Sequence, residues 1–216
     1  TTRGLNEPLV PGTDVLNIGA FFYEEAAFGP LTLSLGGRFD YQEQDAAANE
    51  ALNLPADGEG SDVLDQYYQS LAGSFGANYR VTEELAVVAN VGRGFRAPGV
   101  FDLHVDGQHG GIAAYQQGSP GLRPEHNWST DLSMKWQSQN VRAEATVYQN
   151  WINDYIFLTR VPDQKGPDGQ LPLYQTVQGD AELTGGYASV AWDVLPSVTL
   201  KGSAELVEGS SNGQPS

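Results

Sequence analysis

The strongest indication of how this chain folds is the segment Leu85–Glu125, which reads LAVVANVGRGFRAPGVFDLHVDGQHGGIAAYQQGSPGLRPE. In its first part, apolar residues alternate with small or polar ones, and a period of two over that length predicts a β-strand with one apolar face. Pro98 ends the strand, because it has no N–H to donate and disfavours a helical residue before it. The apolar face carries Leu85, Val87, Ala89, Val91 and Phe95; the other carries Ala86, Val88, Asn90, Gly92, Gly94 and Arg96.

A long glycine-rich segment follows Pro98, and we expect it to be a nearly structureless loop that ends at Pro120, Pro124 and Glu125. The connections along the chain alternate between short and long, which is typical of an up-and-down outer-membrane β-barrel. We therefore predict an all-β, antiparallel up-and-down meander of about eight strands, as in a transmembrane β-barrel. The predicted strands are Val15–Glu25, Leu31–Gln42, Tyr67–Arg80, Leu85–Arg96, Trp128–Trp136, Val141–Tyr155, Leu173–Asp193 and Val198–Val207.

The strand Leu31–Gln42 indicates which environment each face of the sheet contacts. Its polar face includes Arg38 and Asp40, and burying these charges in a dry β-sandwich would be costly, whereas a wet barrel lumen accepts them. This strand therefore argues against the other all-β interpretation, a soluble acidic sandwich that binds carbohydrate. We expect the lipid-facing side to carry Leu33, Leu35, Phe39, Val87, Val91, Leu132 and Met134, with an aromatic girdle of Tyr41, Tyr79, Trp128, Trp136 and Trp151, and the concave side to carry Arg38, Asp40, Asn90, Asp131 and Lys135.

Three features of the remaining chain complete the expected layout. Glu43–Gln66 and Arg160–Pro172 are predicted to be long loops, the first of them acidic. In Leu173–Asp193 the alternation breaks near Gly185-Gly186, where a β-bulge would restore it. Because the chain begins at Thr1 with no signal-peptide pattern, we expect it to be a piece of a longer polypeptide.

Two motifs flank the long loop after Pro98. Gly94-Phe95-Arg96-Ala97-Pro98 precedes it, and Gly118-Ser119-Pro120-Gly121-Leu122-Arg123-Pro124-Glu125 closes it. In this order and spacing they resemble TonB-dependent outer-membrane receptors, in which a strand ending in a Phe-Arg-Ala-Pro-like motif leads into a long extracellular loop that returns through a Gly-x-Pro-x-Leu-x-Pro-Glu-like motif. The residues that match are Phe95, Arg96, Ala97, Pro98, Gly118, Pro120, Leu122, Pro124 and Glu125.

The resemblance implies that residues 1–216 are part of the β-barrel domain of such a receptor, in a barrel of about 22 strands, without the plug domain and the final barrel strands. It implies a protein of the Gram-negative outer membrane that takes up a scarce nutrient, such as a ferric siderophore or a metal ion, by TonB-coupled active transport. The implied partners are outer-membrane lipid, the receptor's own plug domain, the TonB energy-coupling protein and a small nutrient ligand. The alternative is a small passive or adhesive barrel of eight strands.

Composition excludes several function classes. The net charge of −16, from 11 Lys and Arg against 27 Asp and Glu, argues against binding nucleic acid, which requires a basic patch. The chain has no cysteine, which excludes disulfides and thiolate catalysis. It also lacks HEXXH, Walker and GxGxxG motifs and any recognisable catalytic histidine arrangement. We therefore expect neither an enzyme nor a resident cofactor.

All three histidines lie in the long loop or at its edge, which makes the loop the candidate substrate-binding site. Imidazole and carboxylate groups together suit zinc, copper or nickel ions, and His104, Asp106 and His109 are the candidate metal ligands, with Glu125 able to supply a fourth. The alternative is that these are ordinary polar side chains of a loop tip. The candidate substrate-binding residues are His104, Asp106, His109, Tyr115, Glu125 and His126.

Arginines on the lumen-facing side offer a second candidate feature. They could steer an anionic iron chelate, because guanidinium groups bind carboxylates and phosphates well. The alternative is a ladder of ion pairs with Asp40, Asp131 and Glu144. The arginines concerned are Arg38, Arg80, Arg96 and Arg142.

Overall fold

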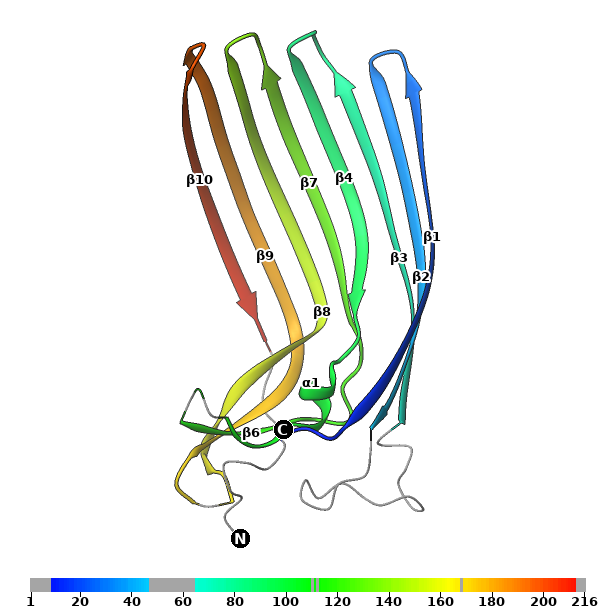
Figure 1. The fold of residues 1–216 in the computed structure, drawn as a ribbon, viewed down its shortest axis with the longest axis vertical. Helices are drawn as coiled ribbons and strands as arrows, with labels where there is room; N and C mark the ends of the chain where they lie inside the picture. The colour runs from blue at the N-terminus through cyan, green and yellow to red at the C-terminus, as the bar shows by residue number, and fades with distance from the viewer. Residues whose placement is uncertain (1–8, 47–64, 110, 112, 168, 213–216) are drawn as a thin grey trace.

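The computed structural model describes residues 9–46, 65–109, 111, 113–167 and 169–212, which form one short helix and one sheet, antiparallel except for a single short parallel pair (Figure 1). No helix in these residues has the length and apolar character needed to cross a membrane. The elements are β1 (Thr13–Phe28), β2 (Leu31–Ala46), β3 (Asp65–Arg80), β4 (Leu85–Arg96), α1 (Val100–His104), β5 (Asp106–His109), β6 (Ala114–Gln117), β7 (Glu125–Gln137), β8 (Val141–Lys165), β9 (Pro172–Leu195) and β10 (Val198–Ser211).

Eight of the strands form the predicted meander. Each of β1, β2, β3, β4, β7, β8, β9 and β10 pairs antiparallel with its neighbour in that series. The short turns lie together at one end of the sheet, with α1 and β6 at the other (Figure 1). Within the described residues, β1 and β10 are the outer edges of the meander and do not pair with each other, so its eight strands do not close into a small barrel.

The registers confirm the predicted faces. Leu35, Phe75 and Val91 are paired across β2, β3 and β4, so they share the apolar face. Arg38 pairs with Ala72, and the register between β2 and β3 runs unbroken from Leu31 to Asp45, so Arg38 lies on the opposite, polar face from Leu35. The five girdle residues also fall on the apolar face, and each is at least partly exposed. A face this large and apolar requires an apolar medium to cover it.

The predicted bulge in β9 is wrong. The register between β8 and β9 runs without interruption through Gly185 and Gly186, and the irregularity lies instead between Ile152 and Tyr155 of β8. Asp154, inside that irregularity, has a φ of 56°, in the left-handed region. The alternation in β9 weakens because Gly185 leaves room for its partner Tyr148 of β8: a Cβ built at Gly185 would overlap the Tyr148 ring.

Three of the predicted loops contain more regular structure than expected. Most of Arg160–Pro172 belongs to strands, because β8 continues to Lys165 and β9 begins at Pro172. The two ends of the acidic segment Glu43–Gln66 belong to β2 and β3, and its central part, 47–64, lies outside the described residues. The segment after Pro98 contains α1, β5 and β6, so the expectation of a nearly structureless loop is also wrong.

Candidate functional site

The candidate site is the β4–β7 loop, residues 97–124, and its first element is α1. Pro98 ends β4, and α1 starts after Gly99. The Gly99 N–H donates to Asp102 Oδ2 at 3.0 Å, which satisfies one backbone donor at the start of the helix. Leu103 N–H then donates to the Gly99 carbonyl at 3.1 Å. Asp102 at the third helical position is a local signal for this helix that the strand-based sequence interpretation missed.

The loop has a small hydrophobic core of its own. Leu103 from α1, Leu122 from the closing motif and Ile156 from β8 are each at most 6% exposed and contact one another. Leu122 is thus the family-motif residue that packs the end of the loop against its beginning and against β8. Burial of such side chains stabilises a compact loop by about 1.5–3 kcal/mol each.

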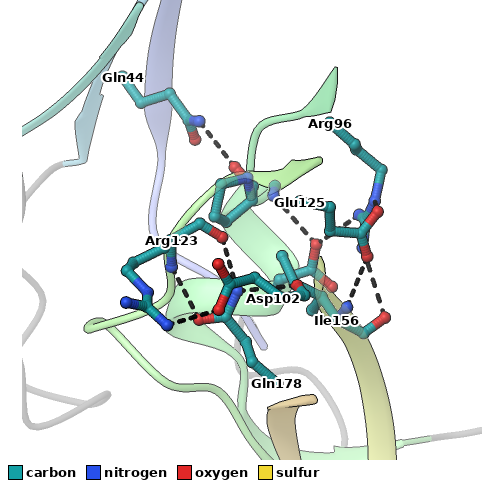
Figure 2. Close-up of polar contacts among 10 residues, drawn as sticks. Gln44, Arg96, Asp102, Arg123, Glu125, Ile156 and Gln178 are labelled. Atoms are coloured by element: carbon teal, nitrogen blue, oxygen red, sulfur yellow. Dashed lines mark hydrogen bonds and ion pairs between the residues drawn. The ribbon is translucent and has the colours of Figure 1, made fainter. Parts of the chain in front are cut away.

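A charged cluster, which we call the clamp, joins both ends of the loop to β8. It consists of Arg96, Asp102, Glu125 and the backbone N–H of Ile156 (Figure 2). Arg96 binds Glu125 in bidentate fashion, with Nε donating to Oε2 and Nη2 to Oε1, both at 2.9 Å. Its Nη1 donates to Asp102 Oδ2 at 2.9 Å, and Ile156 N–H donates to Glu125 Oε1 at 2.5 Å. The planar guanidinium suits this arrangement because it presents several donors in a fixed geometry.

A second set of contacts holds the irregular part of β8. Arg123 Nη2 donates to Asp154 Oδ1 at 2.5 Å, next to the backbone irregularity. Gln178 of β9 accepts from the Arg123 N–H at 2.9 Å and donates to the carbonyls of Arg123 at 2.7 Å and Asp154 at 3.0 Å (Figure 2). Asp154 and Gln178 were missed by sequence reasoning, since nothing local in the sequence marks a partner in a different strand.

The loop lies over the polar face of the sheet. Gln44 Nε2 of β2 donates to the Pro98 carbonyl at 2.8 Å, and Gln66 Nε2 of β3 donates to the Pro120 carbonyl at 3.1 Å. Gln44 and Gln66 are paired with each other on the same face as Arg38. The loop therefore folds inward across the wall that carries the charged side chains, rather than projecting away from it.

The loop also joins the far end of the β8–β9 hairpin. β6 pairs with β9 in parallel, from Tyr115 opposite Leu173 to Gln117 opposite Gln175. β5 pairs with β6, so the hairpin and the loop share one small sheet beyond the clamp. Together they form a composite platform at the end of the sheet opposite the short turns.

The structure separates the predicted metal ligands. The His104 imidazole is 4% exposed, and its Nδ1 has no hydrogen-bond partner among the described residues. Burial lowers the pKa of His104 below its ordinary value of 6.5. Asp106 Oδ1 accepts from Tyr115 Oη at 2.7 Å, and Glu125 is held in the clamp. Across the described residues, no group of three or more His, Cys, Asp or Glu side chains is close enough to hold a metal ion.

The other two histidines lie in different surroundings. The His109 ring packs edge-on against Phe101, with ring centroids 6.5 Å apart, and its Nδ1 accepts from the Gly111 N–H at 3.1 Å. His126 lies on the apolar face, opposite Phe95, with its Nδ1 3.4 Å from Arg93 Nη2. Of the three, His109 is therefore the histidine that shares an accessible loop surface with an exposed aromatic ring.

The lumen-side charges form pairs, though not all the predicted ones. Arg38 binds Asp40 as expected, whereas Arg142 pairs with Asp193 and Arg96 with Glu125. Glu144 pairs with Lys135, and Asp131 accepts from Asn90. Apart from Arg96–Glu125, which belongs to the clamp, these pairs are exposed on the sheet face, so each contributes little to stability.

The chain is similar to known proteins in sequence and in fold. The model of the family described as "TonB dependent receptor-like, beta-barrel" matches residues 4–214. The vitamin B12 transporter BtuB of Photobacterium profundum is 31% identical over 133 residues, which cover 60% of this chain and 20% of that protein. The copper transporter OprC has a TM-score of 0.73 and 16% identity, with 92% of this chain and 30% of OprC covered.

A second solved structure shows the same fold. The FrpB iron transporter of Neisseria meningitidis (F3-3 variant) has a TM-score of 0.64 and 16% identity, over 92% of this chain and 26% of FrpB. The chain thus spans less than a third of the length of each of these proteins. All three are transporters by name, which fits a chain without enzymatic activity.

Proposed function

Since this chain belongs to the TonB-dependent receptor β-barrel family of the Gram-negative outer membrane, we propose that it forms part of a receptor that takes up a scarce nutrient by TonB-coupled active transport. The apolar face contacts lipid and the polar face lines the lumen, which holds the receptor's plug domain. The observation that carries the proposal is the inward-folded β4–β7 loop, clamped at both ends by Arg96 and Glu125. A loop held over the lumen is placed to contact a ligand before it enters.

The surface of this loop suggests which side chains contact the nutrient. His104 is buried and Glu125 is held in the clamp, so both position the loop. Phe101, which is 42% exposed, and the neighbouring His109 present an aromatic face and an imidazole together. We assign these two as contacts for the nutrient, with the Asp106–Tyr115 pair beside them in the β5–β6 hairpin.

The names of the relatives and structural neighbours indicate a class of nutrients rather than one compound. Their names include transporters of vitamin B12, copper and iron and an import receptor for ferric catecholates. A bulky metal chelate is the ligand class we favour, because an aromatic face contacts an organic ligand, whereas a bare ion requires several ligating side chains. Transition-metal ions remain the second substrate class, with His109 as the accessible ligand.

The test uses the full receptor in a strain deleted for the chromosomal copy. Uptake of cobalamin, ferric citrate, ferric catecholates and copper is measured with and without TonB. We expect one of these nutrients to enter the cell only when both the receptor and TonB are present. Uptake that persists without TonB would contradict active transport and favour a passive barrel.

The assigned contact surface is tested in the same system. The Phe101→Ala/His109→Ala variant should weaken surface binding of that nutrient by about tenfold or more, because side chains central to a binding surface contribute most of its affinity. Gln108→Ala, an exposed change in the same loop, is the matched control and should bind normally. Equal binding by all three proteins would remove Phe101 and His109 from the site.

A further inference from the structure

A hollow of about 540 Å³ lies on the polar face near the short turns, far from the β4–β7 loop. The residues that form it come from β7, β8, β9 and β10. Lys135, Glu144, Ser189 and Ser203 are paired across the four strands in one row, with Arg142 and Lys201 in the adjacent row. We call this hollow the basic trough.

The charge of the trough contrasts with that of the chain. Lys135, Arg142 and Lys201 are three of only 11 basic residues in a protein with 27 acidic ones. Arg80 of β3 extends the row, since it pairs with Ala86, which pairs with Lys135. Counting Glu144 and Asp193, the set has four positive and two negative charges.

Two of the four cations are already in ion pairs, and two are not. Lys135 Nζ lies 3.5 Å from Glu144 Oε1, and Arg142 Nη1 lies 2.9 Å from Asp193 Oδ2. Lys201 and Arg80 make no ion pair within the part of the chain that the structure describes. Both are exposed on the polar face. Lys201 also acts electrostatically on Asp193, so what this part of the wall presents is the net positive charge of four cations against two carboxylates.

The shape of the trough favours an extended chain over a small molecule. Part of its lining consists of small residues, with Ser189, Ala191, Gly202 and Ser203 side by side on β9 and β10, next to the larger Tyr187. Small-molecule sites enclose most of the ligand surface, whereas this hollow is open along a sheet face. The lining hydroxyls and flanking cations match the carbonyls and carboxylates of an acidic peptide.

We infer that the basic trough docks an acidic, extended peptide segment inside the lumen, at the end of the barrel with the short turns. The inference rests on the proposed function in one respect, that the polar face lines a lumen occupied by another part of the receptor. The family relatives leave room for such a segment, because the matched region covers only 20% to 30% of their lengths. Charge complementarity then selects an acidic segment, bound chiefly through Lys201 and Arg80.

The experiment measures backbone hydrogen exchange over the whole full-length receptor in detergent. In the Arg80→Glu/Lys201→Glu variant, one acidic segment outside residues 1–216 should exchange at least about tenfold faster, because a lost charge-assisted hydrogen bond is worth about a decade or more in binding. Lys165→Glu, at the opposite end of β8, is the matched control and should leave exchange unchanged. Retention of the heat-modifiable band shows that each variant barrel has folded.

A charge swap provides the decisive second arm. Replacing acidic residues of the identified segment with lysine in the Arg80→Glu/Lys201→Glu receptor should restore its protection. The inference is overturned if no segment changes, if the only changes lie within β3 and β7–β10, or if the segment that changes is not acidic. It is also overturned if citrate titrated into the wild type binds at the trough and is lost in the variant, which would identify a small-anion site. If the receptor takes up no nutrient but protection of the segment still depends on Arg80 and Lys201, only the proposed function is refuted.

Discussion

Glu125→Gln tests whether the clamp holds the β4–β7 loop in place. The substitution keeps the shape of the side chain and removes its charge. The Glu125 carboxylate accepts two hydrogen bonds from Arg96 and one from the Ile156 N–H, and its side chain is 11% exposed. Glutamine can still accept from Ile156, but its amide has one oxygen and cannot bind Arg96 in the bidentate, charge-assisted way.

The expected magnitude follows from the exposure of Arg96. Hydrogen bonds to charged groups contribute about 1.5–3 kcal/mol each when well shielded. Because the Arg96 side chain is 47% exposed, solvent screening reduces the total for the pair, and we expect a loss of about 2 kcal/mol in the free energy of loop opening. That corresponds to about 30-fold faster hydrogen exchange of the backbone amides that exchange only when the loop opens.

The assay is hydrogen exchange with mass spectrometry on the full receptor, followed over peptides from residues 97–124. Glu144→Gln is the matched control, because Glu144 pairs with Lys135 at 3.5 Å between side chains that are 38% and 53% exposed. That pair is worth about 0.5 kcal/mol or less, so loop exchange should change less than about twofold. The clamp interpretation is refuted if Glu125→Gln leaves loop exchange unchanged, or if both variants accelerate it equally.

Three further predictions concern the loop and the sheet edges. Gly118→Ala should destabilise the closed loop by about 1–3 kcal/mol, because a Cβ there would lie 2.6 Å from the Leu103 carbonyl group. Limited proteolysis of the loop measures this effect. Gly121→Ala is the control and should be neutral in that assay, because a Cβ at Gly121 would have nothing within 4 Å. Since burial lowers the pKa of His104, the open loop takes up a proton more readily than the closed one, so loop stability should fall as the pH drops below about 6.5. Hydrogen exchange between about pH 7.5 and about pH 5.5 measures this, and His104→Gln should flatten the profile. Expressed alone, residues 1–216 should form inclusion bodies and give no heat-modifiable monomer on refolding in detergent, because the outer edges of β1 and β10 lack partners within the described sheet; a stable monomer would contradict this.

The strands and their faces could be predicted from the amino-acid pattern alone. In Leu31–Gln42 and Leu85–Arg96, alternation places Leu35 and Val91 on one face and Arg38 and Asn90 on the other, and the registers confirm it. The prediction of faces succeeds because successive side chains of a strand point to opposite faces, so a few neighbouring residues are enough to reveal the alternation. The two motifs likewise marked both ends of the loop and, through them, the family.

The contacts that hold the loop could not be predicted in this way. The clamp joins Glu125 to Ile156, 31 positions apart, and the Gln44 contact with Pro98 spans 54. Such contacts depend on the register of several strands and on an irregularity in β8, whose position no local pattern revealed. The same holds for the histidines: their closeness in sequence suggested one metal site, yet the short elements of the loop turn His104 into the interior and leave His109 near the surface. Alternation is encoded by adjacent residues, whereas the direction in which a loop side chain points depends on what the folded chain brings against it.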